Sequence, residues 1–277
     1  MKQARKQLRL NTDIFILQKI ICEQRRTVGA DMIVKHTIQF DENSQAQAAQ
    51  IDVKNDIDIA LQSLDIAMPA RVLVLVGGAS GMGEKSSARL ETFFREVVIS
   101  AAKELNLVLI TGGTDAGIMA MLGRAHSVLN CSAQLIGVAA AGTVSWPGRA
   151  PLSEDACNLE PNHPAFILVP GQAWGDEARW LAEIASRIAD RLPSLTLLVN
   201  GGEIALKDVQ LSLAQKRAVL ALKGSGRKAD EFAAALSGDQ LSPSIMEAVA
   251  TQRVALLNLQ ADARENLKIL KSYFSIG

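Results

Sequence analysis

The residues of this chain that most clearly suggest a binding site are glycines that directly follow short apolar runs. The run Val72–Val76 is followed by four of them within seven positions. They are Gly77, Gly78, Gly81 and Gly83. A short β-branched run predicts a parallel strand covered on both faces, and the glycines predict a loop whose backbone N–H groups can approach an anion. A helix expected from about Glu84 would direct its positive end at a phosphate held there.

Three more apolar runs also end in glycine-containing loops. These loops are Thr111–Asp115, Asn200–Glu203 and Gly224–Arg227. The carboxyl ends of parallel strands meet at one edge of a sheet, which is where ligands bind in open parallel sheets. One such loop is weak evidence, since tight turns use glycine for structural reasons alone. Four loops at one edge favour a shared ligand crevice.

Two enzyme classes that use similar loops are excluded by neighbouring residues. A phosphate-binding Walker loop needs lysine directly after its last glycine, but Glu84 stands there and Lys85 comes one place late. The short-chain dehydrogenases need a tyrosine followed four residues later by a lysine. The single tyrosine, Tyr273, is followed at that spacing by Gly277. Neither a nucleoside triphosphatase nor such a dehydrogenase is expected.

The second loop adds polar side chains to the expected crevice. Thr111 and Thr114 supply hydroxyls and Asp115 a carboxylate, groups that can orient a sugar or a phosphate. The alternative for Asp115, together with Thr114, is to cap the following helix. Both interpretations stay open at the level of sequence.

The elements that position these loops form a regular alternation from residue 71 onward. The expected strands are Val72–Val76, Leu107–Thr111, Gln134–Val138, Phe166–Val169, Leu195–Val199 and Ala218–Leu222. The expected helices are Ser86–Leu105, Gly117–Leu129, Asp176–Leu192, Ile204–Gln215 and Lys228–Leu236. This alternation predicts an α/β fold, Rossmann-like and doubly wound, with a mainly parallel sheet.

Helical extensions are expected on both sides of this domain, which gives three regions: 1–70, 71–236 and 237–277. In the first region we expect a helix over Ile14–Arg25, a strand over Met32–Phe40, a polar loop over Asp41–Gln50 and a helix over Asp56–Ile66. The tail from Ser242 to Phe274 is expected to form one or two helices. The long segment between Ala139 and Pro164 is expected to be functional, because idle loops of that length are uncommon.

The composition limits the partners and the compartment. Acidic and basic residues balance at 29 each, so nucleic acid is not an expected partner. Three distant cysteines fit a reducing cytoplasm, and with the three histidines they show no metal-ligand spacing. No apolar run is long enough to span a membrane, and we expect a soluble, cytoplasmic protein. Apolar positions along Ile245–Ile269 make a homo-oligomer the expected assembly.

Longer motifs carry a specific resemblance. The stretches concerned are Glu160–Glu177, Leu197–Gly202 and Ala221–Asp230, with Ile110–Gly117 and Leu135–Gly142 in matching order. They resemble the cytosolic N-terminal homology region of TRPM-type ion channels. The chain is thus similar to the prokaryotic TRPM-like SLOG domains (LSDAT type), relatives of the DprA and LOG (lysine-decarboxylase-like) families. The resemblance covers Val72 to about Leu236 and includes no channel segment.

The resemblance implies a Rossmann-like sensor of nucleotide-derived ligands, with ADP-ribose the type of ligand bound by some channel members, in signalling or defence. It makes Arg227 the candidate for a phosphate contact, against an ion pair with Asp230. Trp174 either stacks on an adenine or ribose or only packs. His163 either lines the cleft or holds its loop through a hydrogen bond.

The resemblance also raises the possibility of catalysis, but the sequence departs from the motif of the catalytic relatives. The LOG relatives that release a base from a nucleotide carry PGG-x-GT-x-x-E. The proline, glycine, threonine and glutamate positions here read Asn200, Ile204, Ala205 and Asp208. The candidate catalytic carboxylates are Glu177, Asp208 and Glu203.

The expected ligand-binding residues come from the four loops and two further segments. They are Gly77, Gly78, Ala79, Ser80, Gly81, Met82, Thr111, Gly112, Gly113, Thr114, Asp115, Gly117, His163, Trp174, Asn200, Gly201, Gly202, Glu203, Gly224, Ser225, Gly226 and Arg227. No metal and no required cofactor are expected, only a nucleotide-type ligand. The first hypothesis is a non-catalytic sensor, and the alternative is a nucleotide-processing hydrolase. Binding of single-stranded nucleic acid is a third, disfavoured by balanced charge and few aromatic residues.

Overall fold

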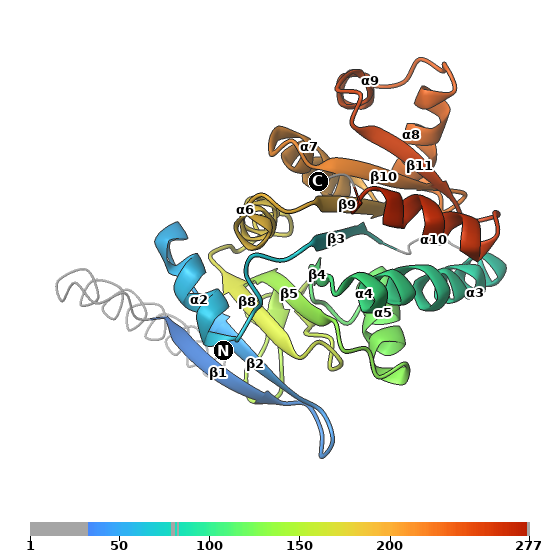
Figure 1. The fold of residues 1–277 in the computed structure, drawn as a ribbon. Helices are drawn as coiled ribbons and strands as arrows, with labels where there is room; N and C mark the ends of the chain where they lie inside the picture. The colour runs from blue at the N-terminus through green and yellow to red at the C-terminus, as the bar shows by residue number, and fades with distance from the viewer. Residues whose placement is uncertain (1–32, 79–80, 82, 276–277) are drawn as a thin grey trace.

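A nine-stranded sheet runs through the computed structural model of this protein, which describes residues 33–78, 81 and 83–275 (Figure 1). The strand order is β1-β2-β8-β5-β4-β3-β9-β10-β11. The strands are β1 (Val34–Gln39), β2 (Gln45–Gln50), β3 (Val72–Gly77), β4 (Val108–Thr111), β5 (Gln134–Ala140), β8 (Ala165–Val169), β9 (Ser194–Val199), β10 (Ala218–Lys223) and β11 (Val254–Asn258). Strands β1 and β2 pair antiparallel, and the other neighbours pair parallel. The expected α/β class with a mainly parallel sheet is confirmed.

Helices cover both faces of this sheet. On one face pack α2 (Ile57–Ser63), α6 (Ala178–Ala189), α7 (Glu203–Ala214), α8 (Arg227–Leu236) and α9 (Pro243–Ala250). On the other pack α3 (Glu84–Phe93), a π-helical stretch (Phe94–Ile99), α4 (Ser100–Leu105), α5 (Gly117–Val128) and α10 (Ala263–Ser272). The expected helices from Ser86 to Leu236 are thereby confirmed, each within a few residues.

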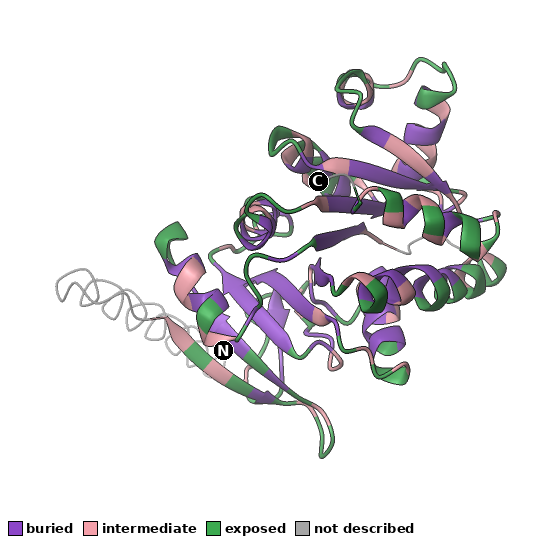
Figure 2. Ribbon diagram, viewed as in Figure 1, coloured by how far each residue is buried: buried purple, intermediate pink, exposed green. Residues whose placement is uncertain are grey.

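The apolar run of β3 illustrates why the sheet is buried on both faces. Val72, Val74 and Val76 enter one core cluster, whereas Leu73 and Leu75 enter the other. Successive side chains of a strand point to opposite faces, so a continuous apolar run serves two helical layers at once. Figure 2 shows the consequence, with buried strands between helices whose outer sides are exposed.

The N-terminal region differs from expectation at one element. The polar segment expected to be a loop contains the strand β2, in which Gln45 and Gln47 are exposed and the three alanines are buried. The prediction of a loop was wrong because small alanines are enough to pack this strand beside β8: Ala46 and Ala48 enter one core cluster and Ala49 enters another. The strand and helix expected near residues 32–66 are present as β1 and α2. The helix expected over Ile14–Arg25 lies outside the described residues.

The C-terminal tail and the long central segment also contain strands. The tail, where one or two helices were expected, contains the two helices α9 and α10, but β11 lies between them and pairs with β10. A short apolar run such as β11 cannot be told from a helical segment by periodicity alone. Within residues 139–164, β6 (Val144–Ser145) and β7 (Cys157–Asn158) form a small separate sheet.

The strand order creates a switch point beside β3. From β3 the chain moves outward through β4, β5 and β8, then returns to place β9 on the other side of β3. The helices after β3 and β4 lie on one face and those after β9 and β10 on the opposite face. Loops at such a point diverge and leave a crevice at the carboxyl edge. None of the helices in the described part of the chain is long and apolar enough to cross a membrane.

Gly137→Ala tests how closely β5 packs against Phe166 of β8 and against the loop after β4. A Cβ at position 137 would lie 2.5 Å from Cδ1 of Phe166 and 2.7 Å from Cα of Gly113. Since the Phe166 side chain is fully buried, we expect the free energy of unfolding to fall by about 1–3 kcal/mol, measured by urea denaturation. Gly112→Ala is the control, because a Cβ there meets nothing within 4 Å. Equal stability of the two variants would contradict the prediction.

Candidate ligand-binding site

A pocket of about 470 Å³ opens at the carboxyl edge of the sheet, at the switch point. Its walls come from the ends of β3 and β5, the loops after β4 and β9, and the first turns of α6, α7 and α8. The lining residues are Leu75, Val76, Gly77, Gly78, Gly112, Thr114, Met119, Ala139, Ala140, Thr143, Trp174, Glu177, Leu181, Gly202, Glu203, Ile204, Ala205, Asp208 and Arg227. The volume is within the usual range of small-molecule sites.

Three helices begin at the wall of this pocket. Glu177 is the N-cap residue of α6, Gly202 is that of α7, and Arg227 is the first residue of α8. The helix dipole is positive at the end where a helix begins, and the first backbone N–H groups have no partner within the helix. In α8 the N–H groups of Lys228 and Ala229 already donate to the Gly201 and Asn200 carbonyls, so this helix contributes mainly through its dipole. The arrangement favours an anionic group in the pocket.

The guanidinium of Arg227 adds a fixed positive charge. A Cβ placed on Gly202 would lie 2.8 Å from Nη2 of Arg227, so the guanidinium packs directly over that glycine. The expected alternative, an ion pair with Asp230, is not formed: Asp230 Oδ1 accepts a hydrogen bond from Gly224 N at 2.6 Å. No other described residue forms an ion pair with Arg227. Its backbone has a φ of 47°, a left-handed conformation that non-glycine residues adopt mainly where the surroundings impose it.

Asn200 and Ser225 hold the loops that carry Gly202 and Arg227. The hydroxyl of Ser225 accepts a hydrogen bond from Asn200 N at 2.7 Å, and Asn200 Nδ2 donates to the Ser225 carbonyl at 2.9 Å. Ala229 N donates to the Asn200 carbonyl at 3.0 Å. Both side chains are buried. They join the two loops and line no part of the pocket.

Trp174 stands at the pocket mouth on a well-supported loop. Trp174 is 39% exposed, and neighbouring Ile204 is 42% exposed. Asp176 Oδ2 accepts hydrogen bonds from Gln172 N and Ala173 N at 2.9 and 3.0 Å. Lys207 Nζ donates to the Gly175 carbonyl at 2.8 Å and ties the loop to α7. An exposed indole on a fixed loop presents a face on which a flat ring can stack.

Two carboxyl groups share the inner part of the pocket. Burial raises the pKa of Glu177, whose Oε2 also accepts a hydrogen bond from Gly175 N at 3.0 Å. Burial, together with the negative charge of Glu177, raises the pKa of Asp208 to about 8, and Lys207 offsets this only in part. Asp208 is therefore mainly protonated at neutral pH. Glu203, the third candidate, is mostly exposed and pairs with Lys228 at 2.9 Å.

The predicted residues divide into those that line the pocket and those that do not. The lining set contains Gly77, Gly78, Gly112, Thr114, Trp174, Gly202, Glu203, Arg227 and the carboxylates Glu177 and Asp208. The predicted residues elsewhere are Thr111, Gly113, Asp115, Gly117, His163, Asn200, Gly201, Gly224, Ser225 and Gly226. Ala79, Ser80 and Met82 lie outside the described residues, and Gly81 between them is exposed.

Two alternatives left open by the sequence are resolved. Helix α5 is preceded by Ala116 as its N-cap, with no capping hydrogen bond from a side chain, so neither Thr114 nor Asp115 caps it. His163 is fully buried and hydrogen-bonded, with Nε2 2.9 Å from Thr111 Oγ1, so it holds its loop instead of lining the cleft. Thr114 lines the pocket wall.

Several lining residues were not expected from the sequence. They are Leu75, Val76, Met119, Ala139, Ala140, Thr143, Leu181, Ile204 and Ala205. Ala139 and Ala140 end β5, which is followed by a turn that contains Gly142, and the rule that ligands bind at strand ends could have identified them. The other residues are apolar or small and carry no distinguishing chemistry.

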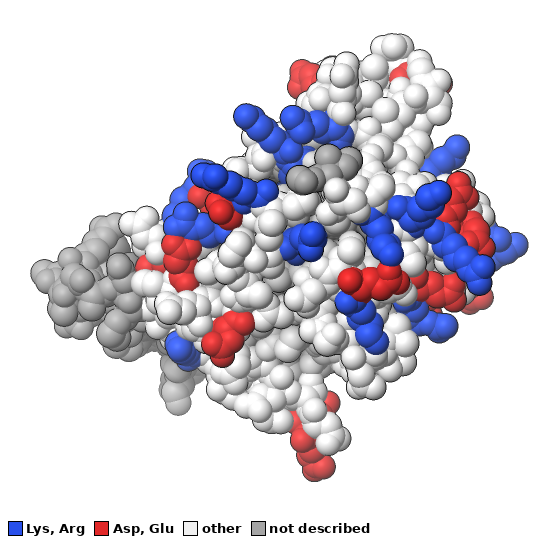
Figure 3. All heavy atoms as spheres, in the orientation of Figure 1, with Lys and Arg blue, Asp and Glu red and all other residues white. Residues whose placement is uncertain are grey.

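Charges outside the pocket are mixed in sign. On the face drawn in Figure 3, basic and acidic side chains of the described residues lie close to one another. Lys54 pairs with Glu183 and Arg187 with Asp58 on the surface. Among the described residues no group of three His, Cys, Asp or Glu side chains is placed to hold a metal ion.

Comparison with known proteins relates this geometry to one family. The model of the family described as "SLOG in TRPM, prokaryote" matches residues 70–267. The chain is 24% identical over 226 residues to transient receptor potential cation channel subfamily M member 2 of Rattus norvegicus, covering 67% of this chain and 15% of the relative. It is 24% identical over 279 residues to the subfamily M member-like 2 protein of Nematostella vectensis, covering 84% and 17%. The chain thus corresponds to a small part of these relatives.

Asp208→Asn tests the protonated carboxyl. Between its ordinary pKa of 3.8 and its folded pKa of about 8, the folded protein keeps a proton that the unfolded chain releases. The free energy of unfolding therefore falls as pH rises through this interval, and the variant should lose less stability between about pH 5 and 8, measured by urea denaturation. The exposed Asp239→Asn is the control. A wild-type slope in Asp208→Asn would refute the assignment.

Proposed function

This chain belongs to the family described as SLOG in TRPM, prokaryote, and we propose that its pocket binds a nucleotide of the ADP-ribose or NAD-derived class. The observation that carries the proposal is that the N-terminal ends of three helices and the guanidinium of Arg227, which forms no ion pair with any described residue, meet in one pocket. A phosphate or pyrophosphate is the group that such an arrangement binds best.

The remaining walls suit the other parts of such a ligand. The exposed indole of Trp174 offers a stacking surface for a base at the mouth. Glu177 and Asp208 offer oxygens that can bind ribose hydroxyls, and Asp208 carries little negative charge at neutral pH to repel a phosphate. A pocket of about 470 Å³ open at its mouth can take much of a nucleotide.

We propose that the protein is a cytoplasmic sensor and that ligand binding is the event it detects. A bound ligand would contact the loops after β3 and β4 together with the first turns of α6, α7 and α8, so it would join the two halves of the sheet. A ligand shifts a conformational equilibrium to the extent that it binds one state more tightly than another. A ligand that contacts both halves of the sheet would bind more tightly to the state in which the two halves are held together.

Arg227→Ala tests the phosphate contact. We expect the affinity for ADP-ribose, measured by titration calorimetry, to fall by about ten- to a hundredfold, because a charge-assisted hydrogen bond is lost. Arg95→Ala, which removes an exposed arginine outside the pocket lining, should bind as the wild type does. Unchanged affinity in Arg227→Ala would remove this residue from the site.

A thermal-shift screen of the wild type against ADP-ribose, NAD, AMP and ATP tests the function as a whole. At a ligand concentration of about one hundred times Kd, binding adds about 2.7 kcal/mol to the free energy of unfolding. No shift with any of these compounds would refute the proposed function.

The carboxyl pair favours a second candidate function, hydrolysis of the bond between base and ribose. Protonated Asp208 can donate its proton to the departing base, while Glu177, in the molecules in which it is ionised, can accept a proton from the water that adds to ribose C1′. The base leaves with the bonding electrons and gains a proton, and the sugar gains the hydroxyl. Two neighbouring carboxyl groups with different proton affinities are the arrangement that such general acid–base catalysis needs.

Chromatography after prolonged incubation with ADP-ribose, NAD and nucleoside monophosphates separates the two functions. A sensor returns its ligand intact, which is the result we expect. A hydrolase releases free base, and Glu177→Gln should then abolish the release. Glu231→Gln, which removes a carboxylate that pairs with Lys228 outside the pocket lining, should preserve it. Free base formed equally by the wild type and Glu177→Gln would exclude the carboxyl pair as its source.

A further inference from the structure

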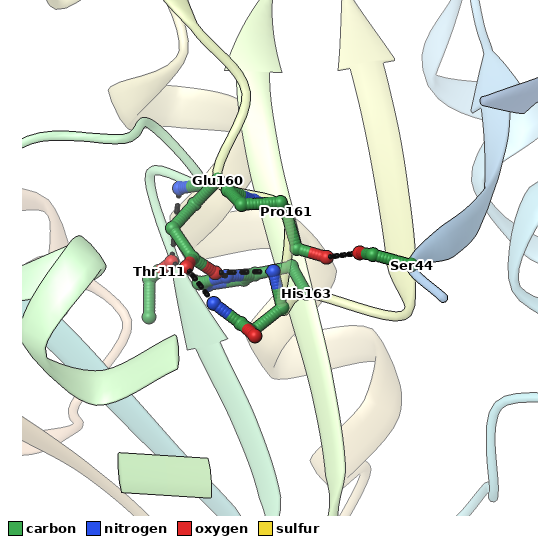
Figure 4. Close-up of polar contacts among 7 residues, drawn as sticks. Ser44, Thr111, Glu160, Pro161 and His163 are labelled. Carbon is green, nitrogen blue, oxygen red and sulfur yellow. Dashed lines mark hydrogen bonds and ion pairs between the residues drawn. The ribbon is translucent and has the colours of Figure 1, made fainter. Parts of the chain in front are cut away.

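A buried polar cluster lies directly behind one wall of the pocket. It consists of Thr111 at the end of β4 and Glu160, Asn162 and His163 in the segment before β8 (Figure 4). Thr111 and Glu160 are each 1% exposed and His163 is 0% exposed. Buried polar groups are costly unless each is hydrogen-bonded, so the cluster calls for a physical account.

The hydrogen bonds of the cluster form one continuous relay. Thr111 Oγ1 lies 2.9 Å from His163 Nε2, and His163 Nδ1 lies 2.6 Å from Glu160 Oε2. Asn162 donates to both Glu160 oxygens, from N at 3.0 Å and Nδ2 at 2.5 Å. Thr111 Oγ1 also accepts from Gly113 N at 2.9 Å. With hydrogen on Nδ1, the imidazole donates to Glu160 and accepts from the Thr111 hydroxyl, and every group in the chain is satisfied.

The order hydroxyl, imidazole, carboxylate is that of a hydrolytic triad. In a triad the hydroxyl faces the substrate, but the Thr111 residue is 1% exposed and lines no part of the pocket. Its oxygen is instead occupied by the backbone N–H of Gly113. The relay therefore ends on the backbone of the loop whose residues Gly112 and Thr114 line the pocket.

The same segment holds this loop along its length. Glu160 N donates to the Gly113 carbonyl at 2.9 Å, and Asp115 N donates to the Asn158 carbonyl at 2.7 Å. Glu160 also packs against α5, since a Cβ on Gly123 would lie 2.0 Å from its Oε2. The Ser44 hydroxyl, between β1 and β2, donates to the Pro161 carbonyl, so the segment that carries Glu160 and His163 also contacts the N-terminal hairpin (Figure 4).

We propose that Thr111, His163 and Glu160 form a positioning relay that sets the Gly112–Thr114 wall and so determines how tightly the pocket holds its ligand. The inference rests on the proposed nucleotide-binding function. The Thr111 hydroxyl acts through Gly113, without touching the ligand. Loss of that hydroxyl leaves the Gly113 N–H and His163 Nε2 without partners in a buried setting, and the loop gains freedom to move.

A pair of Thr111 variants tests the relay. Thr111→Val keeps the shape of the side chain and removes the hydroxyl, while Thr111→Ser keeps the hydroxyl. We expect ADP-ribose affinity, measured by titration calorimetry, to fall about tenfold in Thr111→Val, the effect of one hydrogen bond, and to stay within about threefold of wild type in Thr111→Ser. Rescue by serine separates the hydroxyl from general packing.

Thr196→Val is the matched control. Thr196 is fully buried on β9, and its hydroxyl donates to Ser212 Oγ at 2.9 Å, away from the pocket lining. It should lose stability as Thr111→Val does and keep wild-type affinity. An affinity in Thr111→Val within about twofold of wild type, or an equal loss in Thr196→Val, would overturn the positioning role.

Amide hydrogen exchange in the free protein supplies a readout that needs no ligand. Residues 112–116 should exchange faster in Thr111→Val than in the wild type, Thr111→Ser or Thr196→Val, because the Gly113 N–H has lost its acceptor. Unchanged exchange there would also overturn the relay. If the wild type binds no nucleotide, the proposed function fails, and the exchange result still decides whether the relay holds the loop.

Discussion

The contact of β3 with β9 is the constraint on which the rest of the pocket depends. At Gly77 a Cβ would lie 1.9 Å from the carbonyl oxygen of Val199, so glycine alone lets the two strands stay paired up to their ends. The loops that follow then lead to helices on opposite faces of the sheet. The space between these loops is the pocket, and its position follows from the strand order.

Buried polar residues then hold the walls at this point. Asn200 and Ser225 join the loops that carry Gly202 and Arg227, and the relay from Thr111 to Glu160 supports the opposite wall. A polar side chain in the core must find partners with defined geometry, whereas an apolar side chain tolerates many arrangements. Placing polar pairs behind the walls therefore makes the pocket more definite in shape than apolar packing alone would.

Groups of both signs line the pocket, so one part of it suits an anion and another part suits hydroxyl groups. Arg227 and the helix N-termini favour an anion, while Glu177 and Asp208 bring carboxyl groups into the same space. Burial raises the pKa of both carboxyl groups and so reduces the repulsion that a phosphate would meet. A ligand with a phosphate at one end and hydroxyls at the other matches this division. The same pair of carboxyl groups is what makes hydrolysis a physically reasonable second candidate.

Most of the central fold follows from local patterns in the sequence. Strand and helix periods, with glycine at the strand ends, were enough to predict six parallel strands, their helices and the edge where the pocket lies. Strands β2 and β11 were not predicted. Neither the alanines and glutamines of β2 nor the five residues of the short run β11 show a clear hydrophobic period. Their conformation is imposed by the strands they pair with.

Which polar residues face the pocket depends on how the chain packs in three dimensions. Thr111 and Thr114 stand three residues apart in one loop, yet one is a buried support and the other lines the wall. Asp208, in the helix after β9, gains its raised pKa from burial and from Glu177, which lies 31 positions earlier in the chain. Residue types and spacing identify groups capable of chemistry, but burial and neighbours distant in sequence determine what each of them does.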